Sequence, residues 1–243
     1  MNRAAAIALF VWVAASSAAA QTSPSVLYRY GSGIDARCNG PADSQTVSQD
    51  QADALRARMP ALQRAWDRQG PALLDAASSI TGKRFAERGV VASFVFCRRF
   101  GSLAVPLLVD ANLAVGFGFG AQPSFIITDI VFHELLHSLL LDHYPLFIGG
   151  PLARKYANEK PRVRGHLHLF ALQSVVYRAL GRDDVLADVI ATSSRFGDTN
   201  RRAWQIVVAE GAEAFVAELR QVNQAGLRRS PSAPPPPRIR FGP

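Results

Sequence analysis

The sequence has few of the residues and motifs on which several classes of enzyme depend. Its 243 residues include only two cysteines, Cys38 and Cys97, which are too few for a cysteine-only zinc site. It lacks the G-x-S-x-G motif of many serine hydrolases. The glycines of residues 116–120 have the spacing G-x-G-x-G, which differs from the G-x-G-x-x-G of dinucleotide-binding loops. The sequence therefore gives no support for cysteine-cluster, serine-nucleophile or nucleotide chemistry.

Acidic residues are also scarce relative to basic ones. The chain carries 27 Lys and Arg against 19 Asp and Glu, which gives a formal net charge of +8. Such a charge favours weak contact with anionic envelope surfaces. The arginines are dispersed, however, and no nucleic-acid-binding motif accompanies them, so we expect no specific nucleic-acid partner.

The first 20 residues are typical of a cleaved signal peptide. A basic start is followed by an apolar core and by three alanines, Ala18 to Ala20, at the cleavage site. This apolar run is shorter than the ~20 residues of a membrane-spanning helix, and we expect no later segment to cross a bilayer. The mature protein should be exported, either periplasmic or secreted, with Cys38 and Cys97 forming one disulfide or remaining as buried thiols.

The rest of the chain predicts an α+β fold that is mostly helical, with a small β-sheet before a buried helix. Residues 21–48 are rich in Ser, Gly, Asp and Pro, which predicts an irregular lead-in. Residues 49–227 should form one folded domain. The basic, proline-rich residues 228–243 lack core-forming periodicity and should form a disordered tail.

Hydrophobic periodicity predicts the elements of the first half of this domain. Residues 50–80 have apolar residues at helical spacing around Pro60, which predicts two or three helices. The short apolar runs 90–97 and 103–109 predict a β-hairpin, and NLAVGFGFG, which begins at Asn112, predicts a further strand.

The second half of the domain should be helical. Residues 124–143 are almost continuously apolar, which predicts a helix buried on most sides. A second helix is expected from about residue 162 to Leu180, because Gly181 suits a helix C-terminus. Two later stretches, DVLADVIATSS and RRAWQIVVAEGAEAFVAELRQ, should be helical too.

The apolar segment 124–143 contains the sequence HELLH. Residues four apart on a helix are offset by roughly 40°, so His133 and His137 project from one face and are able to bind the same metal ion. Glu134 lies beside them, and burying it without a partner would cost about 2–7 kcal/mol. A metal ion and its water supply that partner, with Glu134 as the general base. All five histidines fall between residues 133 and 168, which also favours a metal site.

HELLH on a buried helix after a short sheet resembles the motif of the zincin metallopeptidases. The resemblance covers roughly residues 90 to 180. In that family the two histidines bind Zn²⁺, the glutamate is the catalytic base, and a third ligand comes from downstream. The resemblance therefore implies that residues 49–227 form a zincin-like catalytic domain that acts on a peptide or protein substrate, with His133 and His137 as metal ligands and Glu134 as the base.

Two candidates for the third ligand follow patterns of zincin subfamilies. His143 has the spacing of the third histidine of the metzincins, but Leu140 replaces the glycine of that motif, and no methionine follows for the Met-turn. Glu159 resembles the glutamate of the gluzincins, but it precedes Pro161 and should lie before the second helix.

His166 and His168 fit an antiparallel packing of the two helices. His137 lies six residues before the end of the first helix at His143, and His168 lies six residues after the start of the second near Arg162. We therefore predict His168 as the third ligand and keep His166 as the alternative. The histidine that is not a ligand should hydrogen-bond close to the metal or stabilise an oxyanion.

Other polar residues have weaker claims. Asp129, one turn before His133, should either orient that ring or cap the helix. The strand at 103–109 is a candidate to bind an extended substrate at the sheet edge. Three tyrosines are candidate oxyanion donors or core residues: Tyr144, Tyr156 and Tyr177.

The sequence thus predicts an exported zinc-dependent peptidase. The alternative is a non-catalytic envelope protein whose histidines form a structural metal site or a buried cluster. A catalytic zinc site keeps one open position beside three protein ligands, whereas a structural site has four protein ligands.

Overall fold

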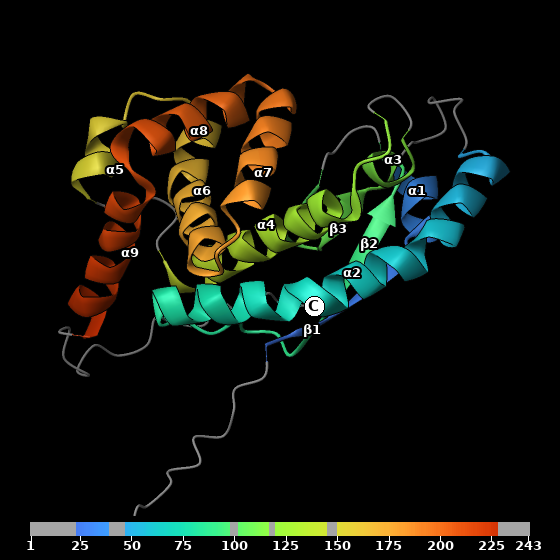
Figure 1. The fold of residues 1–243 in the computed structure, drawn as a ribbon, viewed down its shortest axis with the longest axis horizontal. Coiled ribbons are helices and arrows are strands. Elements are labelled where there is room, and N and C mark those ends of the chain that lie inside the picture. The colour runs from blue at the N-terminus through green and yellow to red at the C-terminus, as the bar shows by residue number, and fades with distance from the viewer. Residues whose placement is uncertain (1–22, 39–46, 98–101, 117–119, 145–149, 228–243) are drawn as a thin grey trace, which may run out of the picture.

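The predicted α+β, mostly helical fold is confirmed (Figure 1). The computed structural model describes residues 23–38, 47–97, 102–116, 120–144 and 150–227. The predicted signal peptide and proline-rich tail lie outside these residues. In order, the elements are β1 (Ser25–Tyr30), α1 (Ser32–Cys38), α2 (Gln49–Thr81), β2 (Gly89–Val95), β3 (Leu108–Asp110), α3 (Ala111–Val115), α4 (Ser124–His143), α5 (Pro151–Lys155), α6 (Pro161–Ala179), α7 (Asp183–Arg195), α8 (Asp198–Glu210) and α9 (Ala212–Leu227).

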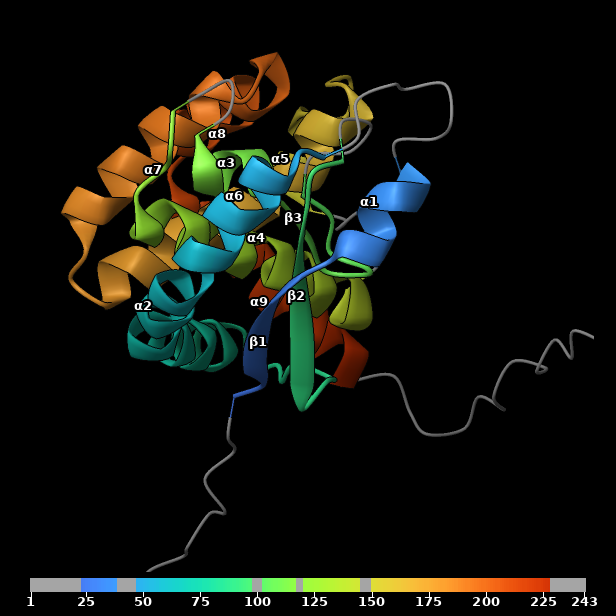
Figure 2. The same ribbon diagram turned by 90° about the vertical axis from the view of Figure 1, so that its right-hand side faces the viewer.

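The three strands form a parallel sheet in the order β1-β2-β3 (Figure 2). The predicted hairpin is therefore wrong. Leu103 forms an antiparallel bridge with Leu108, so the chain turns back on itself before β3 and enters the sheet in the same direction as β2. The strand predicted at NLAVGFGFG is also wrong, because residues 111–115 form the helix α3. The predicted irregular lead-in contains β1 and α1, which is a third correction.

The free edge of β1 is covered by a side chain from α2. Gln63 Oε1 accepts a hydrogen bond from the Tyr28 amide at 2.7 Å, and Gln63 Nε2 donates to the Val26 carbonyl at 2.9 Å. The amide side chain thus pairs with the edge as a neighbouring strand would.

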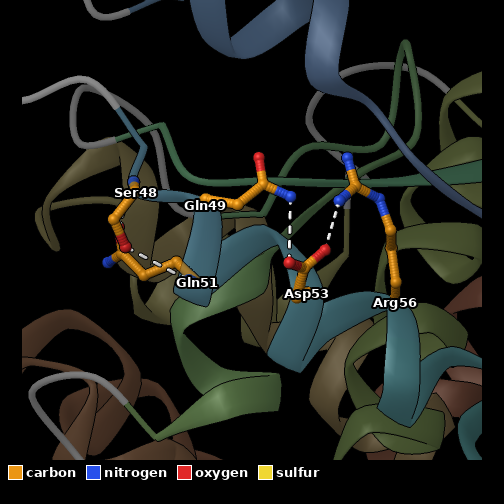
Figure 3. A network of polar contacts seen from close by, with 5 residues as sticks. All are labelled: Ser48, Gln49, Gln51, Asp53 and Arg56. Carbon is orange, nitrogen blue, oxygen red and sulfur yellow. Dashed lines mark hydrogen bonds and ion pairs between the residues drawn. The ribbon is translucent and has the colours of Figure 1, made fainter.

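Residues 49–81 form one helix rather than the two or three predicted. The helix α2 begins with a capping box in which Ser48 and Gln51 exchange hydrogen bonds (Figure 3), and it ends at Gly82 in the left-handed conformation. Pro60 and Pro71 lie within it. Each proline lacks the N–H that would donate to the carbonyl four residues earlier. The helix α2 packs against β1, α4 and α6, and the burial of its apolar face offsets the loss of these hydrogen bonds.

The helix α4 lies at the centre of the molecule, between α2 on one side and α6 and α7 on the other (Figure 1). This confirms the predicted buried helix. By length and composition α4 is long and apolar enough to cross a membrane, contrary to the expectation that no segment after the first 20 residues would be. Its position accounts for its apolar character, because 61% of its most apolar window is buried inside the fold.

The helix α6 confirms the second predicted helix and is also surrounded by other elements. It contacts α2, α4, α7, α8 and α9. Phe170 of α6 stacks on Trp204 of α8, with ring centroids 4.2 Å apart and planes inclined by 7°.

Cys97, which follows β2, is buried and disulfide-bonded, so the alternative of two free thiols is excluded. Cys38 is the only other cysteine in the chain.

Candidate metal centre

Three half-buried histidines from two helices lie close together. His133 and His137 lie one turn apart on α4, and His166 comes from α6. One ring nitrogen of each lies within 4.8 Å of the others. In a tetrahedral zinc site with Zn–N bonds of about 2.0–2.1 Å, ligating nitrogens lie about 3.4 Å apart. Side-chain adjustments of about 1 Å therefore bring these histidines to zinc-binding geometry.

Neighbouring residues fix which nitrogen of two of these rings is free. His166 Nδ1 donates to the Arg162 carbonyl at 2.6 Å, which leaves Nε2 as the ligand atom. His133 Nδ1 lies 3.5 Å from Gln173 Oε1, and Gln173 Nε2 donates to Asp129 Oδ1 at 2.5 Å. Asp129 is thus linked to His133 indirectly, through Gln173. The alternative that Asp129 caps the helix is wrong, because α4 begins at Ser124.

Desolvation favours the neutral, metal-binding form of the three histidines. Desolvation lowers the pKa of His133 well below its ordinary value, and His137 and His166 lower it further. Desolvation and His166 lower the pKa of His137 to about 3. Desolvation also lowers the pKa of His166. The lowered pKa values favour the neutral rings that bind a metal ion.

Glu134 is buried next to this cluster. Its side chain lines the same cleft as the three histidines, and the residue is 7% exposed. Desolvation raises its pKa to about 8. Among the described residues, its carboxylate has no hydrogen-bond or ion-pair partner. A metal ion at the histidines would supply the positive charge that offsets this burial.

The prediction that His168 joins the cluster is wrong. His168 Nε2 lies 3.0 Å from Glu218 Oε2, and both side chains are buried between α6 and α9. Residues two apart on a helix point about 200° apart, so His166 and His168 cannot both face α4. Equal distance from the helix ends pointed to His168 and not to His166. The apolar residues of α6 did not indicate which face contacts α4, because α6 is buried on nearly all sides.

The two subfamily candidates also lie away from the cluster. His143 Nε2 lies 2.5 Å from the Arg84 carbonyl, to which its N–H donates. Glu159 forms an ion pair with Arg202 at 2.5 Å. The metal cluster found in the described part of the chain therefore contains neither.

A cleft of about 760 Å³ opens onto the three histidines and Glu134. Its lining includes residues of α4 and α6 and residues from the end of α7 and the start of α8. Its other lining residues include Ser102, Leu103, Ala104, Asp110, Leu113, Ile126, Ile130, Arg162, Val189, Thr192, Arg195, Phe196 and Asn200. The cleft is large enough for several residues of a peptide.

The predicted substrate edge at residues 103–109 needs correction. Leu103 and Leu108 exchange both backbone hydrogen bonds at 2.9 Å, and the Asp110 amide donates to Ser102 Oγ at 3.4 Å. The backbone groups of Leu108 and the Asp110 amide are thus hydrogen-bonded within the chain and are not available to pair with an added strand. Of the predicted edge, Leu103 and Ala104 are the residues that line the cleft in the described part of the chain.

Two candidate oxyanion donors have other partners. The Tyr177 hydroxyl donates to Asp129 at 2.9 Å, and the Tyr156 hydroxyl donates to Glu210 at 2.6 Å.

Gln173 contacts the cluster but was not predicted as a site residue, although the sequence contained a signal for it. It lies seven residues after His166, and this spacing places both on one face of α6.

The chain matches no family model, no curated protein and no solved structure.

Proposed function

We propose that the protein is a zinc-dependent peptidase in which His133, His137 and His166 hold the metal and Glu134 is the general base. The convergence of these three histidines and a buried, unpartnered glutamate on one cleft carries this proposal. Zinc bound by three protein ligands keeps an open position, lowers the pKa of a water there to about 7, and polarises a carbonyl group.

Glu134 removes the proton of the attacking water and delivers it to the leaving amine. The carbonyl of Arg162 and the amide of Gln173 accept from Nδ1 of His166 and His133, which leaves the Nε2 atoms of both rings free and able to hold the metal. The apolar neighbours of Glu134 exclude bulk water, so its carboxylate acts on the proton with little competition from solvent.

The alternative of a structural metal site receives less support. A closed site needs four protein ligands, whereas the cluster found among the described residues has three. His168 is paired with Glu218, so it is not a fourth ligand. The cleft leads directly to the cluster, as a catalytic site requires. The first 20 residues support export as part of the same proposal.

Hydrolysis by the zinc-loaded protein tests this function. Wild type and Glu134→Gln should bind equal amounts of zinc, measured by mass spectrometry, while Glu134→Gln should cleave casein about 10²–10⁴-fold more slowly. Glu159→Gln makes the same chemical change outside the cleft, at a residue paired with Arg202, and should retain full activity. Equal cleavage by Glu134→Gln, or no cleavage by zinc-loaded wild type, would refute the proposal.

A further inference from the structure

Two arginines line the cleft without an acidic partner. Arg162 lies in the first turn of α6, and Arg195 is the last residue of α7. Both are exposed and both line the cleft. Within the described residues no carboxylate lies within ion-pair distance of either guanidinium. Among the described residues, Arg195 Nη2 donates to the hydroxyl of Thr192 at 3.2 Å.

The acidic residues of the cleft do not neutralise these arginines. Asp129 accepts hydrogen bonds from Gln173 and Tyr177 through Oδ1. Asp110 accepts from the backbone and side chain of Asn112 at the start of α3. Glu134 faces the proposed metal site. Among the described lining residues, these two guanidinium groups are the positive charges that are available to an anionic ligand.

Arg162 lies close to the proposed reaction centre. Its carbonyl holds the ring of His166, which is four residues further along the same face of α6. This separation corresponds to about 6 Å along the helix axis. Successive residues of an extended peptide are spaced about 3.3 Å apart. A group bound by Arg162 would therefore belong to a residue within about two positions of the scissile bond.

From this geometry we infer that the cleft selects peptides with a carboxylate within about two residues of the scissile bond. A guanidinium group binds a carboxylate with two parallel hydrogen bonds. Arg162 binds this carboxylate, and two further donors of the cleft lining support it: the guanidinium of Arg195 and the amide of Asn200, which donates to Ser193 Oγ at 3.4 Å. The carboxylate is either a free C-terminus or an Asp or Glu side chain. This inference rests on the proposed peptidase function.

Peptide binding to zinc-loaded Glu134→Gln tests the inference without requiring hydrolysis. The probes are three N-acetylated hexapeptides of one sequence. The first is amidated with a central Gln, the second has a free C-terminus, and the third is amidated with a central Glu. Affinity is measured by isothermal titration calorimetry. At least one acidic peptide should bind about tenfold more tightly than the neutral peptide.

The same titrations are repeated with Arg162→Gln and Arg195→Gln added together to the Glu134→Gln protein. This change should abolish the preference for the acidic peptide. Arg201→Gln is the matched control, because Arg201 lies outside the cleft lining and pairs with Asp198 on the surface. It should keep the full preference. Attraction by the net charge alone would instead fall in the control by about half as much as in the double variant, because the control removes one positive charge and the double variant two.

The acidic peptide that binds more tightly identifies the source of the carboxylate. Equal binding of all three peptides, or a preference that survives loss of both arginines, overturns the inference. Cleavage of neutral and acidic peptides at equal rates by wild type overturns the inference while the peptidase function stands. Preferential binding without any cleavage supports carboxylate recognition and refutes the peptidase function.

Discussion

Asp129 offers a quantitative test of the buried network behind the metal centre. The carboxyl is buried, and desolvation raises its pKa from 3.8 to about 7 despite hydrogen bonds from Gln173 and Tyr177. This shift corresponds to roughly 4 kcal/mol. Because the folded-state pKa is the higher one, the folded protein binds the proton more tightly. Protonation of Asp129 therefore stabilises the folded state fully at pH values below the pKa of the unfolded state, and this stabilisation is lost as pH rises towards about 7.

Asp129→Asn keeps the Oδ1 acceptor and removes the titration. Urea unfolding of metal-free wild type and variant at about pH 5 and about pH 8 measures the difference in free energy of unfolding at each pH. Between these values the variant should gain roughly 3 kcal/mol relative to wild type. The new amide N–H adds a cost that is independent of pH, so it cancels in this comparison. A difference that is the same at both pH values would refute the assignment of a buried carboxyl with a raised pKa.

Three further substitutions test the packing around the site by their effect on the urea midpoint. Gly150→Ala should destabilise by about 1–3 kcal/mol, because a Cβ at Gly150 would overlap the buried Glu218 carboxylate. Gly165→Ala is its control, because no atom lies within 4 Å of the added Cβ on α6, and it should stabilise by about 0.5–1 kcal/mol. Gln63→Ala should destabilise by about 1–3 kcal/mol, since it leaves two backbone groups of β1 without partners. The reasoning at each position would be contradicted by the opposite result. These results are a wild-type urea midpoint in Gly150→Ala or in Gln63→Ala, or a lowered midpoint in Gly165→Ala.

The central part of the fold was predictable because its signals are local. A continuous apolar run indicated α4, and the spacing of His133 and His137 placed both on one face. The end of α6 followed from Gly181, which has a left-handed backbone with φ of 65°. These features depend on residues close together in the sequence.

The third histidine and the sheet were not predictable in the same way. Choosing between His166 and His168 requires knowing which face of α6 contacts α4, and α6 is surrounded by five helices. Pairing of β1 with β2 joins residues about 60 positions apart, and neither strand indicates its partner. The bridge between Leu103 and Leu108 reverses the chain within residues that were assigned to one strand.

Zinc affinity of His166→Ala tests the metal centre most directly. Competition with a chelator should show one zinc ion per wild-type chain and an affinity at least about 100-fold lower in His166→Ala. His143→Ala removes a histidine that bonds the Arg84 carbonyl outside the cluster and should bind zinc as wild type does. Wild-type zinc affinity in His166→Ala would contradict the account.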